Sequence, residues 1–185
     1  GYRHIVCDLV SRSDCQEKLR GERFDAVIHL ASANDTFVDD YPDKALKINT
    51  LGTRNLIEAT IWEGLRRFVY FSTFHVYGVG SGEITEASPT SPRHDYATTH
   101  LFAEEYVRQF FRTHGLPHAI LRLTNGYGCP IDSSSDKWYL LLNDLARMAF
   151  KEEKISLKSN GLAQRDFIWM DDVVRAAEKI LKSDL

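Results

Sequence analysis

A chain of 185 residues with 43% hydrophobic residues is long enough to bury the core of one domain. Its net charge is −3 with acidic and basic residues interspersed, which excludes a basic stripe for nucleic acid and a polybasic membrane patch, so the expected partner is a small molecule. No apolar run reaches the roughly 18 residues of a membrane span, and no signal-peptide pattern opens the chain. The three cysteines lack metal-ligand spacing and fit a reducing compartment. We therefore expect a cytoplasmic protein without a metal site.

The first half of the chain predicts alternating strands and helices. Apolar runs of strand length occupy residues 4–9, 24–31 and 67–72. The second of them is continuous, which is typical of a strand buried on both faces of a parallel sheet. Helical patterns separate the runs, over residues 13–20, where Asp14 is a candidate cap, and over residues 42–59. A loop rich in Gly, Ser, Thr and Pro follows at residues 78–92.

The second half continues the alternation less regularly. Helical periodicity covers residues 95–112, and a strand is expected at residues 118–123. Beyond a polar connection, the pattern predicts an apolar helix at 138–150, short strands at 154–157 and 166–169, and a last helix reaching Leu181. Asp171 or Asp172 is expected to cap that helix.

Alternating strands and helices of this kind predict an α/β fold, a doubly wound parallel sheet with right-handed crossovers. Ligands of such sheets bind at the carboxyl ends of the strands. The sequence therefore directs attention to the residues that follow each predicted strand.

The helix at residues 95–112 carries a tyrosine and a histidine that can share a site. Tyr96 falls in its first turn, and His100 lies four residues on, on the same face one turn later. A phenol beside a base suggests a tuned proton donor. The competing interpretation is a buried tyrosine with a satisfied hydroxyl beside an ordinary helix histidine.

Seven short motifs follow one another along the chain: Asp8-Leu9, His29-Leu30-Ala31-Ser32, Asn49 with Gly52-Thr53, Phe71-Ser72-Thr73 with Val76-Tyr77-Gly78, Tyr96, Arg122-Leu123-Thr124-Asn125 with Tyr127-Gly128, and Arg165-Asp166-Phe167-Ile168. In this order the chain resembles the extended short-chain dehydrogenase/reductase family, which contains NAD-dependent nucleotide-sugar epimerases and dehydratases. The resemblance covers nearly the whole chain.

That resemblance implies a truncated, Rossmann-like sheet with part of a small substrate lobe. It makes residues 1–185 a single partial domain, in which 1–125 form part of a dinucleotide-binding sheet. Residues 126–165 would belong to the substrate lobe, and 166–185 would supply a strand and helix that return to the sheet. By comparison with the family, the chain starts at the third strand and stops before the end of the substrate lobe.

The resemblance also implies roles for individual residues. The implied cofactor-binding residues are Asp8, Leu9, Leu30, Ala31, Ser32 and Asn49. Asp8 would accept a hydrogen bond from the adenine amino group, while Leu30 to Ser32 would pass under the pyrophosphate and ribose. From the residues alone, a strand-end cap is the favoured interpretation of Asp8, and the alternative for the Leu30 to Ser32 stretch is ordinary strand-end packing.

Catalysis by this family uses a tyrosine that exchanges a proton with the sugar while nicotinamide exchanges a hydride. Tyr96 matches that tyrosine, and Thr73 matches the hydroxyl that helps to polarise the reacting oxygen. His100 stands where the family usually has lysine. A neutral imidazole can hydrogen-bond a ribose hydroxyl, but with an unperturbed pKa of about 6.5 it lacks a fixed positive charge at neutral pH. The implied activation of Tyr96 is weaker.

Substrate contacts are implied for His75, Asn125 and Arg165. Asn125 and Arg165 match positions that hold the substrate diphosphate, for which the planar fork of arginine is suited. The alternatives for Arg165 are a solvated charge or an ion pair with Asp166. Family dehydratases usually carry an acidic pair just after the threonine, where this chain has Phe74 and His75. That difference favours an epimerase or a ketone reductase over a dehydratase.

The resemblance implies NAD or NADP as the cofactor, NAD being favoured, and a nucleotide sugar as the substrate; it also allows a homodimer. A Gly-rich turn after a strand, which would bind the pyrophosphate, is missing from the sequence. We therefore expect NAD to bind weakly or not at all to this chain by itself. The second function class is an incomplete or non-catalytic relative that serves as a sugar-nucleotide binder or as a subunit.

Overall fold

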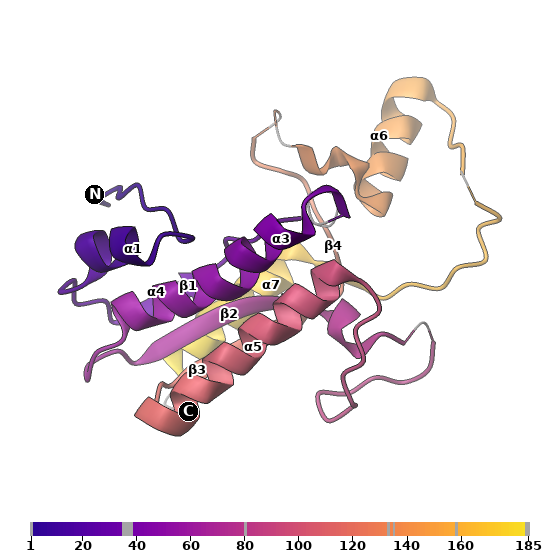
Figure 1. Ribbon diagram of the computed structural model, residues 1–185. Coiled ribbons are helices and arrows are strands. Elements are labelled where there is room, and N and C mark those ends of the chain that lie inside the picture. Colours follow the sequence, from indigo (N-terminus) through magenta and orange to yellow (C-terminus); the bar gives the residue numbers. More distant parts are fainter. Residues whose placement is uncertain are drawn as a thin grey trace. The chain divides into compact units, whose positions relative to one another are not determined.

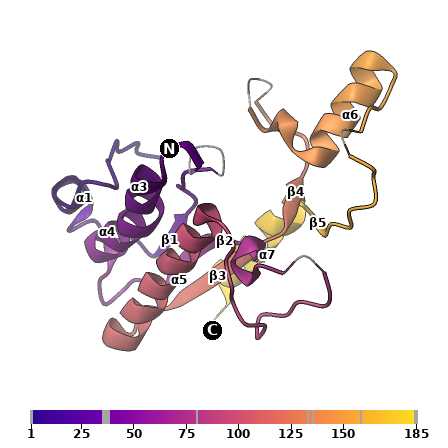
Figure 2. The same cartoon turned by 45° about the vertical axis from the view of Figure 1, so that its right-hand side comes forward.

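The computed structural model describes residues 2–34, 39–79, 81–132, 134, 136–157 and 159–183. The chain divides into two compact units, Gly1–Arg122 and Leu123–Leu185 (Figures 1 and 2). Parallel strands and flanking helices confirm the predicted α/β class. The division falls after Arg122, whereas the sequence placed a boundary at residue 125 inside a single partial domain.

Unit 1 contains the central sheet and the helices that cover it. Its elements are α1 (Arg12–Leu19), β1 (Ala26–His29), α3 (Pro42–Ala45), a π-helical segment (Leu46–Leu51), α4 (Gly52–Thr60), β2 (Arg67–Thr73), a 3-10 helix (Phe74–Tyr77), α5 (Asp95–His114) and β3 (His118–Leu123). The predicted 42–59 helix is thus one continuous helical stretch that widens in its middle third. Such wide turns often occur at functional sites.

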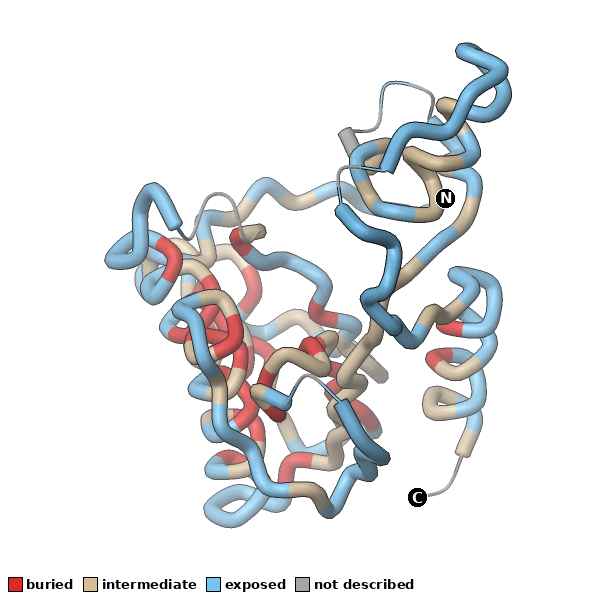
Figure 3. The backbone as a smooth tube through the Cα atoms, turned by 90° about the vertical axis from the view of Figure 1, so that its right-hand side faces the viewer, coloured by how far each residue is buried: buried red, intermediate tan, exposed pale blue. Residues whose placement is uncertain are grey.

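The described strands of unit 1 lie in the order β1-β2-β3, with β1 parallel to β2 and Ala26 opposite Arg67. Helices α4 and α5 run alongside β2 (Figure 1), and their apolar faces meet it in the main core. Fully buried members of that core include Ile57 from α4, Phe68 from β2 and Val107 from α5. Burying each side chain of this size stabilises the fold by about 1.5–3 kcal/mol. Buried residues concentrate in unit 1 (Figure 3).

Two strand predictions for the first half need correction. Residues 4–9 form no strand, because none of the described strands pairs with them to take up their backbone hydrogen bonds. The strand β1 forms as expected but is not buried on both faces, since Ile28 is 43% exposed. It is the outer strand of the described sheet, and the central strand β2 is the one that is buried almost throughout.

Helix α1 begins one residue earlier than predicted and has a different cap. The Ser11 hydroxyl accepts a hydrogen bond from the Asp14 amide at 3.2 Å, so Ser11 is the N-cap. The Asp14 carboxylate instead accepts from the amide of Asp8 at 2.7 Å, which joins the helix to the preceding turn. The pair is not a capping box, because the Asp14 carboxylate accepts from Asp8 and not from the amide of the N-cap residue Ser11.

Unit 2 contains β4 (Asn125–Tyr127), a 3-10 helix (Asp136–Tyr139), α6 (Leu141–Glu152), β5 (Phe167–Trp169) and α7 (Met170–Lys182). Strand β5 pairs in parallel with β4 in a separate sheet, so the predicted return to the main sheet is not seen in the strand pairing. Residues 154–157 do not form the predicted strand. Neither Asp171 nor Asp172 caps α7; both lie in its first turn, where a negative charge favours the helix dipole. None of the described helices is long and apolar enough to cross a membrane.

Replacing Gly78 by alanine should destabilise unit 1 by about 3 kcal/mol, from 1–2 for the left-handed backbone and 1–3 for overpacking. Gly78 has φ +64°, and an added Cβ would lie 1.7 Å from the carbonyl oxygen of Ser91. Gly115 is a matched control because its φ is +69° with no atom within 4 Å of an added Cβ. Urea unfolding should show the larger loss for Gly78→Ala. Equal losses for both variants would contradict the steric argument.

Candidate active site

The first turns of α5 bring Tyr96 and His100 together, as their spacing predicts. The two rings meet edge to face, with centroids 4.7 Å apart. Helix α5 begins one residue before Tyr96, since the His94 ring nitrogen Nδ1 caps it by accepting from the Ala97 amide at 3.3 Å. Tyr96 is half-buried, whereas His100 is 2% exposed.

His100 is held by a tyrosine that sequence reasoning did not single out. The Tyr70 hydroxyl lies 2.7 Å from His100 Nδ1, and Tyr70 on β2 is 1% exposed. Burial, reinforced by the negative charge of Glu104, raises the pKa of Tyr70 well above its usual value. The phenol therefore keeps its proton and can donate it to Nδ1, which leaves the hydrogen of a neutral imidazole on Nε2.

His100 is neutral at physiological pH. Burial, with a smaller contribution from His75 and against the opposing effect of Glu104, lowers its pKa to about 4. The surroundings of His100 thus lower its pKa and do not supply the positive charge of the usual lysine. His100 Nε2 is buried and has no hydrogen-bond partner among the described residues. A buried polar atom without a partner is costly, so this nitrogen is suited to meet a hydroxyl of a bound molecule.

Thr73 and His75 lie at the end of β2. The Thr73 hydroxyl caps the following 3-10 helix by accepting from the amide of His75 at 3.3 Å. The His75 ring then lies 6.3 Å from the Tyr96 ring and 5.1 Å from that of His94, measured between centroids. The carboxyl end of β2 and the start of α5 therefore meet at the expected edge of the sheet.

The residues after β1 form an exposed strip. Leu30 is 65% exposed, and Ala31 and Ser32 are exposed as well. At the end of the strip, the Ala33 amide donates to Asn49 Oδ1 at 2.6 Å, and Asn49 Nδ2 donates to the Thr99 hydroxyl on α5 at 3.0 Å. Asn49 is fully buried in the π-helical segment. Its side chain therefore holds the exposed strip against α5, the helix that carries Tyr96.

Asp8 and Leu9 lie in the turn before α1. The exposed Asp8 carboxylate accepts from the Val10 amide at 3.0 Å, which leaves further acceptor capacity for a ligand. The Leu9 carbonyl accepts from the side-chain amide of Asn55 on α4 at 2.9 Å. Leu9 also packs on Gly52, since a Cβ added to Gly52 would lie 3.3 Å from the Cβ of Leu9. The turn is thereby held against α4.

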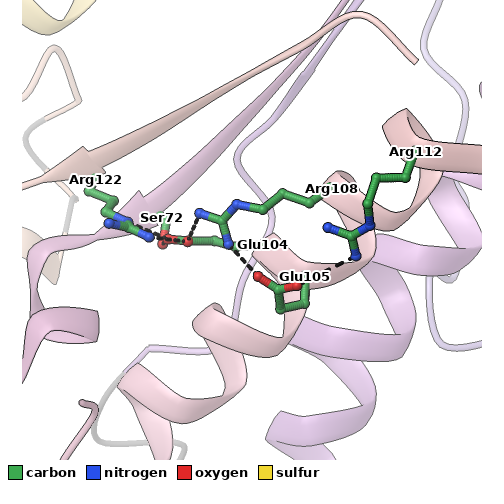
Figure 4. Close-up of polar contacts among 6 residues, drawn as sticks. All are labelled: Ser72, Glu104, Glu105, Arg108, Arg112 and Arg122. Carbon is green, nitrogen blue, oxygen red and sulfur yellow. Dashed lines mark hydrogen bonds and ion pairs between the residues drawn. The ribbon is translucent and has the colours of Figure 1, made fainter. Parts of the chain in front are cut away.

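A buried charge cluster around Glu104 on α5 was not predicted from the sequence (Figure 4). The fully buried Glu104 carboxylate accepts from Arg122 Nε at 2.9 Å and Nη2 at 2.6 Å, and from the Ser72 hydroxyl at 2.6 Å. Arg108 Nη2 forms a further ion pair with the Glu104 carboxylate at 2.8 Å. Burial alone would raise the pKa of Glu104, but these hydrogen bonds and charges outweigh it and lower the pKa. The available signal was spacing, because Glu104 lies four residues after His100 and eight after Tyr96.

The two residues expected to hold a diphosphate lie in unit 2. Asn125 begins β4, and its side-chain amide donates to the carbonyl of Asp166 at 2.9 Å. Arg165 is exposed and directly precedes Asp166. Pairing of β4 with β5 thus brings Asn125 and Arg165 near one another.

These residues fit parts of a dinucleotide. His100 Nε2 offers a hydrogen-bonding atom for a ribose hydroxyl, Asp8 offers a carboxylate for an amino group, and the exposed Leu30 to Ser32 strip offers backbone for close approach. A separate hollow of about 1040 Å³ on unit 1 is lined by residues of α1 and the end of α4, among them Arg12, Glu58 and Trp62, and by none of the proposed site residues. No group of three or more potential metal ligands occurs in the described part of the chain.

His100 should titrate near pH 4 rather than near the ordinary histidine value of about 6.5. Because the folded pKa is the lower one, protonation favours the unfolded chain, and stability should fall as the pH drops below about 6.5 toward 4. Nitrogen-15 NMR of the imidazole rings across this range would measure the pKa, with His100→Gln used to assign the signal. A midpoint at or above 6.5 would refute the burial argument.

Comparisons with known proteins identify the family of the chain. Residues 2–184 match the model of the NAD dependent epimerase/dehydratase family. The chain is 30% identical to dTDP-D-glucose 4,6-dehydratase of Mus musculus over 188 residues, which are 97% of this chain and 50% of that protein. The chain thus spans about half the length of this curated relative.

Solved structures share the fold. RMD from Pseudomonas aeruginosa, complexed with NADPH, has a TM-score of 0.81 and 28% identity over 97% of this chain and 64% of its own. A dTDP-glucose 4,6-dehydratase from Streptomyces venezuelae, with NAD and DAU bound, has a TM-score of 0.76 and 27% identity. The match covers 96% of this chain and 53% of the dehydratase chain. With a family match over almost every residue and the predicted fold, the chain belongs to the NAD-dependent epimerase/dehydratase family.

Proposed function

We propose that the protein that carries this chain uses NAD or NADP to exchange a hydride with a nucleotide-activated sugar, as an epimerase or a reductase. The observation that carries the proposal is the Tyr96–His100 pair, in which a half-buried phenol lies against a fixed imidazole whose Nε2 has no partner among the described residues. When bound, the nicotinamide supplies the hydride chemistry.

Tyr96 is the proton-exchanging residue in this proposal. Its hydroxyl would give a proton to the sugar oxygen, or take one from it, as the hydride moves. His100 would hold a ribose hydroxyl through Nε2, with Tyr70 fixing its ring from the other side. A neutral His100 provides no cation to stabilise the tyrosinate, so we infer that this site runs more slowly than one with lysine.

The end of β2 supports epimerisation or reduction over loss of water. β-Elimination needs an acid and a base near the leaving group, and Phe74 and His75 stand where family dehydratases have their acidic pair. The His75 ring is close to Tyr96, so it is the side chain suited to contact the sugar from this side. Asn125 and Arg165 are our candidates for the diphosphate, whose charge arginine can bind through two parallel hydrogen bonds.

Incubating the full protein with NAD and UDP- or dTDP-hexoses, and separately with NADH and a 4-keto nucleotide sugar, followed by mass spectrometry and NMR of the sugar, would test the proposal. Epimerisation keeps the sugar mass and inverts one carbon, whereas reduction of a 4-keto sugar by NADH adds two hydrogens. Loss of one water would show a dehydratase and overturn the preference stated here. Binding of the nucleotide sugar without any turnover would favour a non-catalytic binder.

A further inference from the structure

Two cysteines lie side by side outside the proposed active site. The Cys7 and Cys15 sulfur atoms are 3.7 Å apart, and both thiols are free. Cys15 is fully buried on α1 beside Leu19 and Ala59, whereas Cys7 is half-buried in the irregular segment of residues 2–8. A third cysteine, Cys129, is exposed in unit 2.

The geometry permits a bond between the two sulfurs. A disulfide needs about 2.0 Å between sulfur atoms, so the thiols must approach by about 1.7 Å. Residues 2–8 form no strand, and no sheet pairing among the described residues fixes Cys7. Besides its contact with Cys7, the Cys15 thiol makes long hydrogen bonds, 3.6 Å to the carbonyl of Asp8 and 3.9 Å to that of Leu9. The required movement therefore breaks no regular secondary structure.

We propose that Cys7 and Cys15 are a redox site, converted by hydrogen peroxide to an intramolecular disulfide that ties residues 2–8 to α1. The proposal does not rest on the proposed enzymatic function. Disulfides formed in reducing compartments are usually transient and redox-sensing, which suits a pair of adjacent but unbonded thiols.

The two cysteines have different parts in the reaction. The Cys7 sulfur, as the more accessible one, attacks the peroxide; the O–O bond breaks, Cys7 becomes a sulfenic acid, and one water leaves. The Cys15 sulfur then displaces the sulfenic hydroxyl, which leaves as a second water with the Cys15 proton. Two thiols are oxidised by two electrons, and one peroxide is reduced to two waters. Burial, with hydrogen bonding to Cys7, raises the pKa of Cys15 to about 12, which suits it to react second rather than first.

The bond would enclose the turn that carries Asp8 and Leu9. That turn is already held to α1 by the hydrogen bond from the Asp8 amide to Asp14. Oxidation adds a covalent tie at the same place. The backbone of residues 2–8 should become more ordered in the oxidised chain.

Peptide mapping after mild oxidation tests the proposal. The folded, reduced chain is treated with a few equivalents of hydrogen peroxide, blocked with N-ethylmaleimide, unfolded and digested. Trypsin cuts after Arg3, Arg12 and Lys18, so Cys7 and Cys15 fall in different peptides. We expect these two peptides to be cross-linked, the link to be lost with dithiothreitol, and Cys129→Ser to leave it unchanged.

Three further outcomes decide the mechanism. In Cys15→Ala, dimedone should trap a sulfenic acid on Cys7, because no second thiol can displace it. Recovery of Cys7 and Cys15 from the unsubstituted chain as maleimide adducts, while Cys129 is oxidised, would overturn the proposal. So would links that join Cys7 or Cys15 of two different chains.

Discussion

Tyr96→Phe should lower the rate of hydride exchange by about 10²–10⁴-fold, the usual contribution of a positioned general acid or base. Phenylalanine keeps the ring that packs on His100 but removes the hydroxyl that would exchange the proton. The affinity for the dinucleotide should change little, so kcat falls more than KM changes. Steady-state kinetics of the full protein, with calorimetry of cofactor binding, would separate the two.

Tyr106→Phe is the matched control for this variant. Tyr106 is also half-buried and lies ten residues further along the same helix, so its substitution repeats the chemical change away from the site. It should keep the parental rate. If Tyr96→Phe also kept the parental rate, Tyr96 would not be the proton-exchanging residue.

Glu104→Ala should destabilise unit 1 by about 3–5 kcal/mol, since it leaves Arg122 and Ser72 without their buried partner. Glu104 is 0% exposed and Arg122 is 13% exposed in the side chain, so water cannot readily replace the lost carboxylate. Urea unfolding followed by circular dichroism would measure the loss.

The neighbouring Glu105 provides the control for this second prediction. It also forms an ion pair with Arg108, at 2.6 Å, but its side chain is 54% exposed (Figure 4). Exposed ion pairs contribute about 0–1 kcal/mol, so Glu105→Ala should be nearly neutral. A loss for Glu104→Ala no larger than that for Glu105→Ala would show that the buried cluster does not stabilise the fold.

The same cluster predicts a pH dependence. The folded pKa of Glu104 is lowered, so its contribution is present above the unfolded value of about 4.3 and is lost as the pH falls through the folded pKa. Glu104→Gln should therefore differ from the parent most near neutral pH. The difference in unfolding free energy should shrink in acid.

Periodicity in the sequence correctly predicted helices, which satisfy their own backbone hydrogen bonds, and strands that have a neighbouring strand to pair with. The helix at residues 95–112 and the strand at 67–72 were placed within two residues of α5 and β2. The strand at 4–9 was predicted on the same apolar signal and is absent, because a strand exists only where another strand takes up its backbone groups. The cap of α1 was misplaced because Ser11 and Asp14 are both good capping residues, and that of α7 because this helix begins after Trp169 without a side-chain cap.

The sequence by itself determined that Tyr96 and His100 share one face of a helix, because four residues make about one helical turn. Only the tertiary structure decided the protonation of His100, since burial, the Glu104 charge and His75 set its pKa, and the Tyr70 hydroxyl decides which ring nitrogen carries the hydrogen. Tyr70 is 30 residues away along the chain, and Glu104 owes its charge to Arg122 on another element. Local pattern fixes which side chains point the same way, whereas a pKa depends on every group that the fold packs around the titrating atom.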